Sequence, residues 1–243
     1  MLKVKLVNFT SNPEMMVAVA ARTCIRDKSY EFLRDELTAQ DVERIVTSVI
    51  SKNHLNVLEH VDFTFSISGV SRVLTHQLVR HRIASYSLLS QQRTDSSQLE
   101  FTIPPDIEKN SDLAREYENA MECCREVYKK LIASGIRRGS ARYVLPSSSN
   151  TRIMTTMNAR ALFNLFSQRE CHAEEWEFRQ VARLMHIELM KMTPKIFRYA
   201  GPPCQTRGHC PEGRDILDCG GYFGVNLIQT QNRVDSSINE LAI

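Results

Sequence analysis

The segment Arg80-His81-Arg82, followed by seven residues and then Ser90, holds residue types that bind anions. An arginine presents a planar set of N–H donors that fits a phosphate or another delocalised anion. Ser87, Ser90 and the backbone N–H groups of the loop can add neutral donors. The same three residues also fit a solvated basic helix end, which the helix dipole favours. For the segment taken alone, the solvated helix end is the favoured interpretation.

Nearby residues allow two other kinds of chemistry, and neither is favoured. Ser90 near His81 could form a nucleophile–base pair, but no carboxylate stands at a recognisable spacing to orient the histidine. His54 and His60 flank Glu59, but the two histidines do not have the i, i+4 spacing of a helical zinc site. We therefore interpret Ser90 as a hydrogen-bond donor to a substrate and His60 as a structural residue.

The composition limits the classes of protein to which this chain can belong. It has 243 residues, 42% hydrophobic and 24% charged, which is ordinary for a globular chain with a substantial core. Its 31 basic and 28 acidic residues give a net charge of only +3, so bulk nucleic-acid binding is not expected. The first residues do not resemble a secretory signal, and no apolar stretch has the length of a membrane span. We expect a cytoplasmic protein that binds neither nucleic acid nor a membrane.

The hydrophobic pattern predicts both strands and helices. Residues 1–9 and 61–69 alternate between apolar and polar side chains, which is typical of half-buried strands, and residues 99–105 indicate a third, short strand. Apolar residues at helical spacing predict a helix after Asn12, another after Thr38, and further helices over residues 70–82, 109–134, 158–169 and 171–192. We expect loops over residues 26–36 and 83–99, the second of them functional, and a mobile tail over residues 222–243.

Six short motifs occur in an order that resembles one enzyme family. Besides Arg-His-Arg with its seven-residue spacer and Ser90, the sequence contains HLNVLEH (54–60), Gln77-Leu-Val-Arg80, ARYVLP (141–146), NARALFNLFSQR (158–169) and EEWEFR (174–179). Six motifs in the same order are far more specific than any one of them. Over roughly residues 1–203 the chain resembles the flavin-dependent thymidylate synthases, the ThyX family.

The resemblance implies a fold and a reaction. The fold is α+β, a mostly antiparallel sheet flanked by helices, in a homotetramer whose sites lie between subunits. The reaction converts dUMP into dTMP, with methylenetetrahydrofolate as the carbon donor and NADPH as the reductant of FAD. The family uses no cysteine nucleophile, so an arginine stabilises the negative charge that develops on the pyrimidine; the resemblance assigns this catalytic role to Arg169. The catalytic domain covers residues 1–203, and residues 204–243 form a cysteine-containing segment rather than an independent domain.

The resemblance also assigns binding residues. The expected dUMP contacts are Gln77, Arg80, Leu88, Leu89, Ser90, Gln91, Gln92, Arg93, Arg142 and Arg169. The expected FAD contacts are His54, Asn56, Arg80, His81, Arg82, Ser87, Asn158, Arg160 and Asn164. For Asn158 a helix N-cap is the alternative, because asparagine is a preferred capping residue.

One position departs from the family pattern. Gln92 stands where the family has an arginine, and Arg93 follows it directly. Either Arg93 reaches the phosphate after a one-residue shift, or Gln92 makes a neutral contact and another cation compensates. Two alternatives for the function stay open: an FAD-dependent enzyme acting on another pyrimidine nucleotide, and a non-catalytic nucleotide- or RNA-binding protein.

Four of the seven cysteines indicate a possible metal site. Cys204, Cys210 and Cys219 lie in a segment rich in glycine and proline, and Cys171 follows Arg169 by two residues. Four thiolates can form a tetrahedral structural zinc site. The paired C-x2-C spacing of strong zinc motifs is missing, so unpaired thiols are the alternative.

Overall fold

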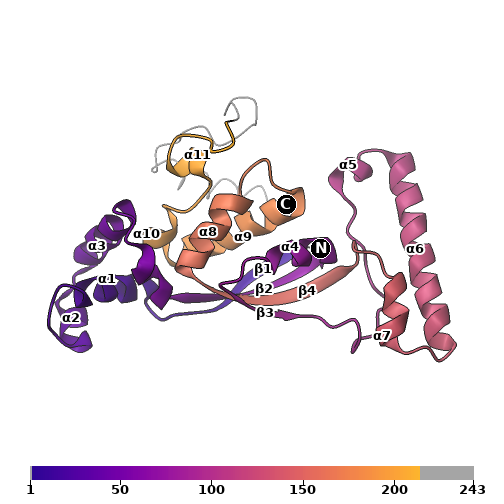
Figure 1. Cartoon of the computed structure of the whole chain (residues 1–243), viewed down its shortest axis with the longest axis horizontal. Coiled ribbons are helices and arrows are strands. Elements are labelled where there is room, and N and C mark those ends of the chain that lie inside the picture. The colour runs from indigo at the N-terminus through magenta and orange to yellow at the C-terminus, as the bar shows by residue number, and fades with distance from the viewer. Residues whose placement is uncertain (1, 214–243) are drawn as a thin grey trace. The chain divides into compact units, whose positions relative to one another are not determined.

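The structure, a computed structural model, describes residues 2–213 (Figure 1). The predicted tail over residues 222–243 and Cys219 lie outside the described residues. The chain divides into two compact units, each built from segments far apart in the sequence. The first unit contains Met1–Val4, Ser66–Arg82 and Tyr86–Thr155, and the second contains Lys5–Phe65, Ile83–Ser85 and Thr156–Ile243.

Four strands form one antiparallel sheet in the order β1-β2-β4-β3, so the predicted α+β class is confirmed. The strands are β1 (Lys3–Phe9), β2 (Asp62–Ser71), β3 (Ser85–Leu88) and β4 (Asn150–Asn158). The predicted alternation holds in β2, where Phe63, Phe65 and Ile67 are fully buried. The sequence did not reveal β4, because two of its buried positions are Thr151 and Thr155, and polar residue types hide the period of two.

The second unit packs most of its helices around an aromatic core. Its helices are α1 (Pro13–Thr23), α2 (Tyr30–Glu36), α3 (Ala39–Ser51), η1 (Leu55–His60), α8 (Ala159–Arg169), α9 (Trp176–Met192), α10 (Pro194–Phe197) and α11 (Pro203–Thr206). Helix α1 contacts α2, α3 and η1, and α8 contacts η1 and α9. Thr38 and Asp41 form a capping box at the start of α3, where the sequence predicted a helix.

Three phenylalanines hold α8 in place within this unit. Phe63, Phe166 and Phe197 are fully buried. The ring of Phe197 meets Phe63 edge to face at 5.3 Å between centroids and Phe166 at 6.1 Å. Edge-to-face pairs add a specific attraction to the burial of the rings. The cluster therefore fixes α8, which ends at Arg169, against β2 and α10.

The first unit carries the remaining helices. They are α4 (Arg72–Leu78), α5 (Pro105–Glu108), α6 (Ser111–Ala133), α7 (Arg138–Ala141) and η2 (Arg142–Val144). Helix α6, the long helix of Figure 1, contacts α5, α7 and η2. Tyr128 of α6 is fully buried, and its hydroxyl accepts a hydrogen bond from the Ser96 N–H at 3.3 Å. This contact fixes the loop after Gln92 against α6.

Two predicted loops contain regular structure. Helix α2 lies within residues 26–36, because Ser29 caps it by accepting the Phe32 N–H at 3.3 Å and Leu33 is buried. Strand β3 lies within residues 83–99, where serines obscure the strand pattern. A charged or hydroxyl-rich segment can therefore be regular when one face is covered.

Three predicted boundaries are also wrong. The helix predicted over residues 70–82 ends at Leu78, and its Val73 is 41% exposed. Residues 99–105 form only an isolated bridge between Phe101 and Ser149. Helix α9 begins at Trp176 instead of residue 171, because the Glu175 side chain caps it there. No helix within residues 2–213 has both the length and the apolar character of a membrane span.

Candidate active site

The Arg80-His81-Arg82 segment lies in a turn of the first unit, beyond the end of α4. The Arg80 N–H donates to the Gln77 carbonyl at 3.2 Å, and the His81 N–H donates to the Leu78 carbonyl at 3.1 Å. Arg80 and Arg82 are exposed. Neither forms an ion pair with any carboxylate among the described residues, so both are available to an anion.

Tyr86 of β3 holds this turn closed. Its hydroxyl lies 2.8 Å from the Leu78 carbonyl oxygen and 2.7 Å from the His81 carbonyl oxygen, and donates its proton to them. Burial raises the pKa of Tyr86 to about 12, so the hydroxyl stays protonated at neutral pH. The hydroxyl thus bridges the last residue of α4 and the turn that follows it, and gives the carbonyl at the helix end a second donor.

The loop after β3 brings several predicted dUMP contacts together. The Ser90 carbonyl accepts the N–H groups of Arg93 and Thr94 at 3.1 and 3.0 Å, which makes a tight turn. Gln91 is buried, and its amide Nε2 has no hydrogen-bond partner; the same is true of Oε1 of Gln77. Buried polar atoms without a partner are uncommon, and a ligand is one reason for them. Leu88 and Leu89 precede this turn and are half-buried.

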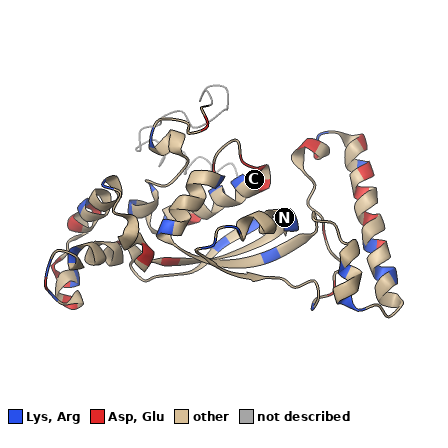
Figure 2. Ribbon diagram, viewed as in Figure 1, with Lys and Arg blue, Asp and Glu red and all other residues tan. Residues whose placement is uncertain are grey.

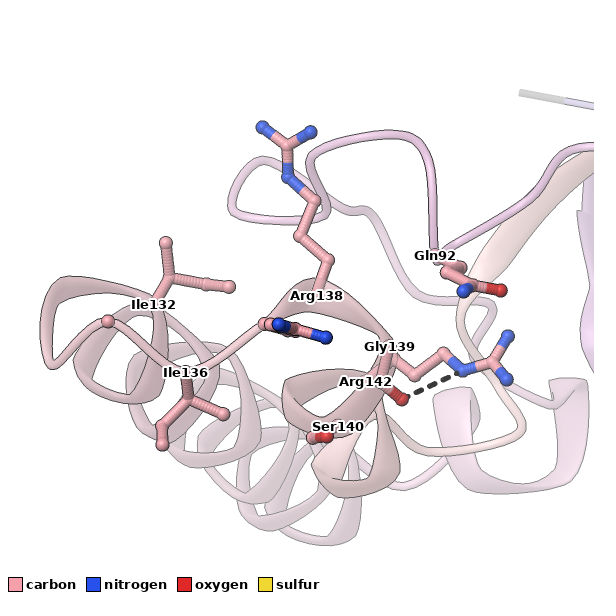
Figure 3. A pocket seen from close by; sticks show the side chains of 9 residues that line it. Gln92, Ile132, Ile136, Arg138, Gly139, Ser140 and Arg142 are labelled. Atoms are coloured by element: carbon pink, nitrogen blue, oxygen red, sulfur yellow. Dashed lines mark hydrogen bonds between the residues drawn. The ribbon is translucent and has the colours of Figure 1, made fainter.

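A pocket of about 730 Å³ lies beside this loop (Figure 3). Its lining residues are Gln92, Ile132, Gly135, Ile136, Arg137, Arg138, Gly139, Ser140 and Arg142. Figure 3 shows the Gln92 amide near the Arg142 guanidinium, with the two isoleucines away from them. The pocket is lined by Gln92 and not by Arg93, whose backbone carbonyl instead accepts a hydrogen bond from Arg138 Nη1 at 3.2 Å. Of the two residues considered for the family's arginine position, Gln92 is therefore the one that lines this pocket.

The pocket is positively charged. Arg137, Arg138 and Arg142 line it, and no carboxylate of the described chain forms an ion pair with any of them. Burial, followed by the positive charge of Arg142, lowers the pKa of Arg72, which shows that Arg142 acts on a second cation nearby. Figure 2 shows α7 without acidic residues, whereas acidic and basic residues alternate along α6. Clustered like charges without counter-ions mark an anion site.

In the second unit, predicted flavin contacts lie on η1 and on the exposed side of α8. Arg160 forms an ion pair with Glu59 of η1, and Asn164 follows Arg160 by one turn on the exposed face. His54 and Asn56 at the start of η1 are exposed as well. The arrangement presents amide, imidazole and guanidinium donors from neighbouring elements, which suits the many acceptor atoms of a dinucleotide.

Asn158 caps α8. Its Oδ1 accepts the Ala161 N–H at 2.8 Å, which is the N-cap interaction named as the alternative to flavin binding. The cap uses only the carbonyl oxygen of the side chain, so the amide N–H groups are still able to donate.

Arg169 is the last residue of α8, and α9 fixes its side chain. Arg169 forms an ion pair with Glu174, and its guanidinium lies over the Phe178 ring, 4.8 Å from the centroid. The second oxygen of Glu174 accepts the Glu175 N–H at 3.0 Å. The sequence did not reveal Glu174 as the partner, although it lies in the EEWEFR motif. A carboxylate and a ring together hold the guanidinium in one orientation.

The residue after Arg169 belongs to a buried pair that the sequence also did not reveal. Glu170 Oε1 lies 2.8 Å from His186 Nδ1, and His186 Nε2 lies 3.0 Å from the Phe197 carbonyl oxygen. Burial would lower the pKa of His186, but the charge and hydrogen bond of Glu170 and the Phe197 carbonyl outweigh it, so the pKa is raised. Helix α8 is thereby anchored at its last turn.

The described cysteines give the zinc prediction no support. Within residues 2–213 no three His, Cys, Asp or Glu side chains lie close enough to hold a metal ion. Cys171, Cys204 and Cys210 are among the residues described, and Cys219 is not. Their spacing in the sequence carries no information on whether the loops converge.

Known proteins resemble this chain over most of its length. The family model described as "Thymidylate synthase complementing protein" matches residues 5–195, which include all six motifs. The chain belongs to this family. It is 40% identical over 235 residues to a "Flavin-dependent thymidylate synthase" of Clostridium tetani, covering 90% of this chain and 93% of that protein. Proteins of the same name from Geobacter sulfurreducens (41% over 221 residues; 90% and 94%) and Pyrococcus horikoshii (40% over 228 residues; 90% and 93%) are similar to it as well.

Proposed function

We propose that the chain is an FAD-dependent thymidylate synthase that converts dUMP into dTMP, with methylenetetrahydrofolate and NADPH as co-substrates. The observation that carries the proposal is the similarity at about 40% identity across 90% of the chain to proteins of that name. When bound, FAD supplies the hydride that completes the methyl group. The residues of the chain then have to bind dUMP, orient it and stabilise charge on its ring.

The basic pocket of the first unit binds the phosphate of dUMP. Arg142 supplies a charged fork of donors and Gln92 a neutral amide, both within the pocket lining. The unpartnered Gln77 Oε1 and Gln91 Nε2 offer one acceptor and one donor for the nucleoside. Ser90 adds a hydroxyl donor from the same loop, and acts without nucleophilic attack.

Arg169 stabilises the pyrimidine during reaction. A guanidinium beside the N3–C4=O edge of uracil favours the electron-rich form of the ring, in which carbon 5 is nucleophilic. The ion pair with Glu174 and the contact with Phe178 hold the guanidinium before substrate arrives, so little reorganisation is needed. FAD is bound by the residues that the resemblance assigns to it: His54, Asn56, Arg80, His81, Arg82, Ser87, Asn158, Arg160 and Asn164.

Four copies assemble into the active enzyme. Val73 and Val79 of the first unit are 41% and 42% exposed, and the proposed assembly would bury them between subunits. Sedimentation should show a particle of four chains of 27.9 kDa each. A monomer with full activity would contradict the assembly without affecting the reaction.

The decisive experiment combines a spectrum and a product assay. The purified protein, loaded with FAD if necessary, should show flavin absorbance and form dTMP from dUMP, methylenetetrahydrofolate and NADPH. A protein that cannot be loaded with FAD would refute the enzyme; a nucleotide- or RNA-binding protein would then show binding to nucleic acid that depends strongly on salt. A flavoprotein that binds another pyrimidine nucleotide and forms no dTMP would establish the alternative enzyme.

A further inference from the structure

We infer that Arg138 is a phosphate-binding residue of the basic pocket, where it supplies the cation that the neutral Gln92 does not. The inference rests on the proposed function and deepens it, because it names a residue that contributes to nucleotide affinity. The pocket would then hold a phosphate dianion between Arg138 and Arg142, with the Gln92 amide as a neutral third donor.

Arg138 connects the pocket to the loop after β3. It opens α7, lines the pocket, and donates from Nη1 to the Arg93 carbonyl at 3.2 Å. This bond ties the guanidinium to the loop that carries Ser90 and Gln92 (Figure 3 shows its side chain extending from α7). A guanidinium has five N–H groups, so one bond to a carbonyl leaves most of its donors for a ligand.

Gln92 packs against the backbone of α7. A Cβ at position 139 would lie 3.5 Å from Gln92 Cγ, so the Gln92 side chain packs against Gly139, the residue after Arg138. Arg142 Nε donates to the Gly139 carbonyl at 3.3 Å. Gly139 thus lies between the Gln92 side chain and the Arg142 guanidinium, and it directly follows Arg138 in α7.

Arg138 forms no direct ion pair with a carboxylate in the part of the chain that the structure describes. The Ser97 hydroxyl and N–H donate to the two oxygens of Asp95 at 2.7 and 3.0 Å. These hydrogen bonds chiefly lower the pKa of Asp95, and the charge of Arg138 adds to this effect. Asp95 therefore attracts Arg138 through space without an ion pair, and the guanidinium keeps N–H donors that a phosphate can accept.

The test compares ligands with and without a phosphate on the FAD-loaded protein. Arg138→Gln should raise the dissociation constant of dUMP about tenfold, in line with the loss of one charge-assisted hydrogen bond. The dissociation constant of deoxyuridine, which has no phosphate, should stay the same. Arg115→Gln is the matched control, because it removes the same charge from an exposed arginine of α6 that lies outside the pocket. It should leave the dissociation constants of dUMP and of deoxyuridine unchanged.

A second variant moves the cation across the pocket. Adding Gln92→Arg to Arg138→Gln should restore dUMP affinity to within about threefold of the original, because both positions face one anion. An unchanged dUMP affinity in Arg138→Gln, or no recovery in the double variant, would overturn the role of Arg138 while dTMP synthesis by the wild type stands. If the wild type binds dUMP no better than deoxyuridine and forms no dTMP, the proposed function fails as well.

Discussion

Arg169 has a fixed guanidinium. Its side chain is 20% exposed, and Glu174 and Phe178 contact it from the loop before α9 and from the first turn of that helix. The aromatic ring adds orientation without adding negative charge. The proposed reaction requires this oriented guanidinium to polarise the pyrimidine.

Replacement of Arg169 should separate flavin binding from turnover. We expect Arg169→Ala to retain bound FAD and to lose at least about a hundredfold in dTMP formation, the typical cost of removing one oxyanion-stabilising donor. Arg169→Lys should recover only part of the rate, because an ammonium lacks the planar fork. Flavin absorbance and the dTMP rate measure the two effects. Full activity in the alanine variant would refute the assigned role.

Asn158 presents two roles that two substitutions can separate. Asn158→Ala removes the cap on Ala161 and should lower the free energy of unfolding by about 1 kcal/mol. Asn158→Asp keeps a capping oxygen but removes the amide donor, so its stability should stay within about 0.5 kcal/mol of the wild type while FAD binding weakens. Urea denaturation and FAD titration measure the two quantities. Unchanged FAD affinity in the aspartate variant would leave Asn158 with the cap alone.

At the level of elements, the sequence predicted strands with one apolar face and helices with a clear N-cap. Strand β2 and helix α8 are of this kind, since β2 alternates cleanly and Asn158 caps α8. Helix α4 is shorter than predicted: after Leu78 the chain forms a turn, and the hydroxyl of Tyr86, eight residues beyond the helix end, bonds to that turn. A contact from a residue outside the helix leaves no signal in the hydrophobic pattern of the helix itself.

Removing the Tyr86 hydroxyl should loosen the Arg-His-Arg turn. Tyr86→Phe loses the donor to two carbonyls and should lower the free energy of unfolding by about 1–2 kcal/mol at pH 7. The pKa of Tyr86 is raised from 10 to about 12, so the neutral hydroxyl favours the folded state. That contribution is fully present below pH 10 and is lost as the pH rises towards 12.

Guanidinium denaturation at several pH values measures the effect of Tyr86. The wild type should lose stability above pH 10 more steeply than the phenylalanine variant. Equal slopes in this range would mean that the hydroxyl has the same environment in the folded and unfolded states.

For the whole molecule, the sequence motifs name candidate site residues such as Arg142 and Arg169, and their roles stay predictions. The motifs do not reveal the residues that position them. Glu170–His186 and the bond from Arg138 to the loop join segments 16 and 45 residues apart in the sequence. Such contacts depend on how the units fold, and nothing in residue type or spacing reveals them.

The Glu170–His186 pair should couple the stability of the whole fold to pH. The Phe197 carbonyl can only accept, so His186 Nε2 donates to it, and the protonated ring also donates from Nδ1 to Glu170. Because the pKa of His186 is raised above its ordinary value of 6.5, its contribution is fully present below about pH 6.5 and is lost as the pH rises through the folded pKa. The free energy of unfolding should therefore fall on the alkaline side of pH 6.5.

Two variants on α9 test this coupling. His186→Ala leaves Glu170 buried without its partner and should lower the free energy of unfolding by about 3 kcal/mol at pH 6. The change of that free energy with pH between 6 and 8 should become smaller. Glu188→Gln is the control, because Glu188 lies on the same helix and pairs with Lys191, and a glutamine keeps an oxygen that can accept the Leu6 N–H as Glu188 does. Its cost should be below about 0.5 kcal/mol with the slope unchanged. Urea unfolding at fixed pH values measures both. A slope in His186→Ala equal to that of the wild type would show that other groups produce the pH dependence, and that the pair only fills space beside Phe166.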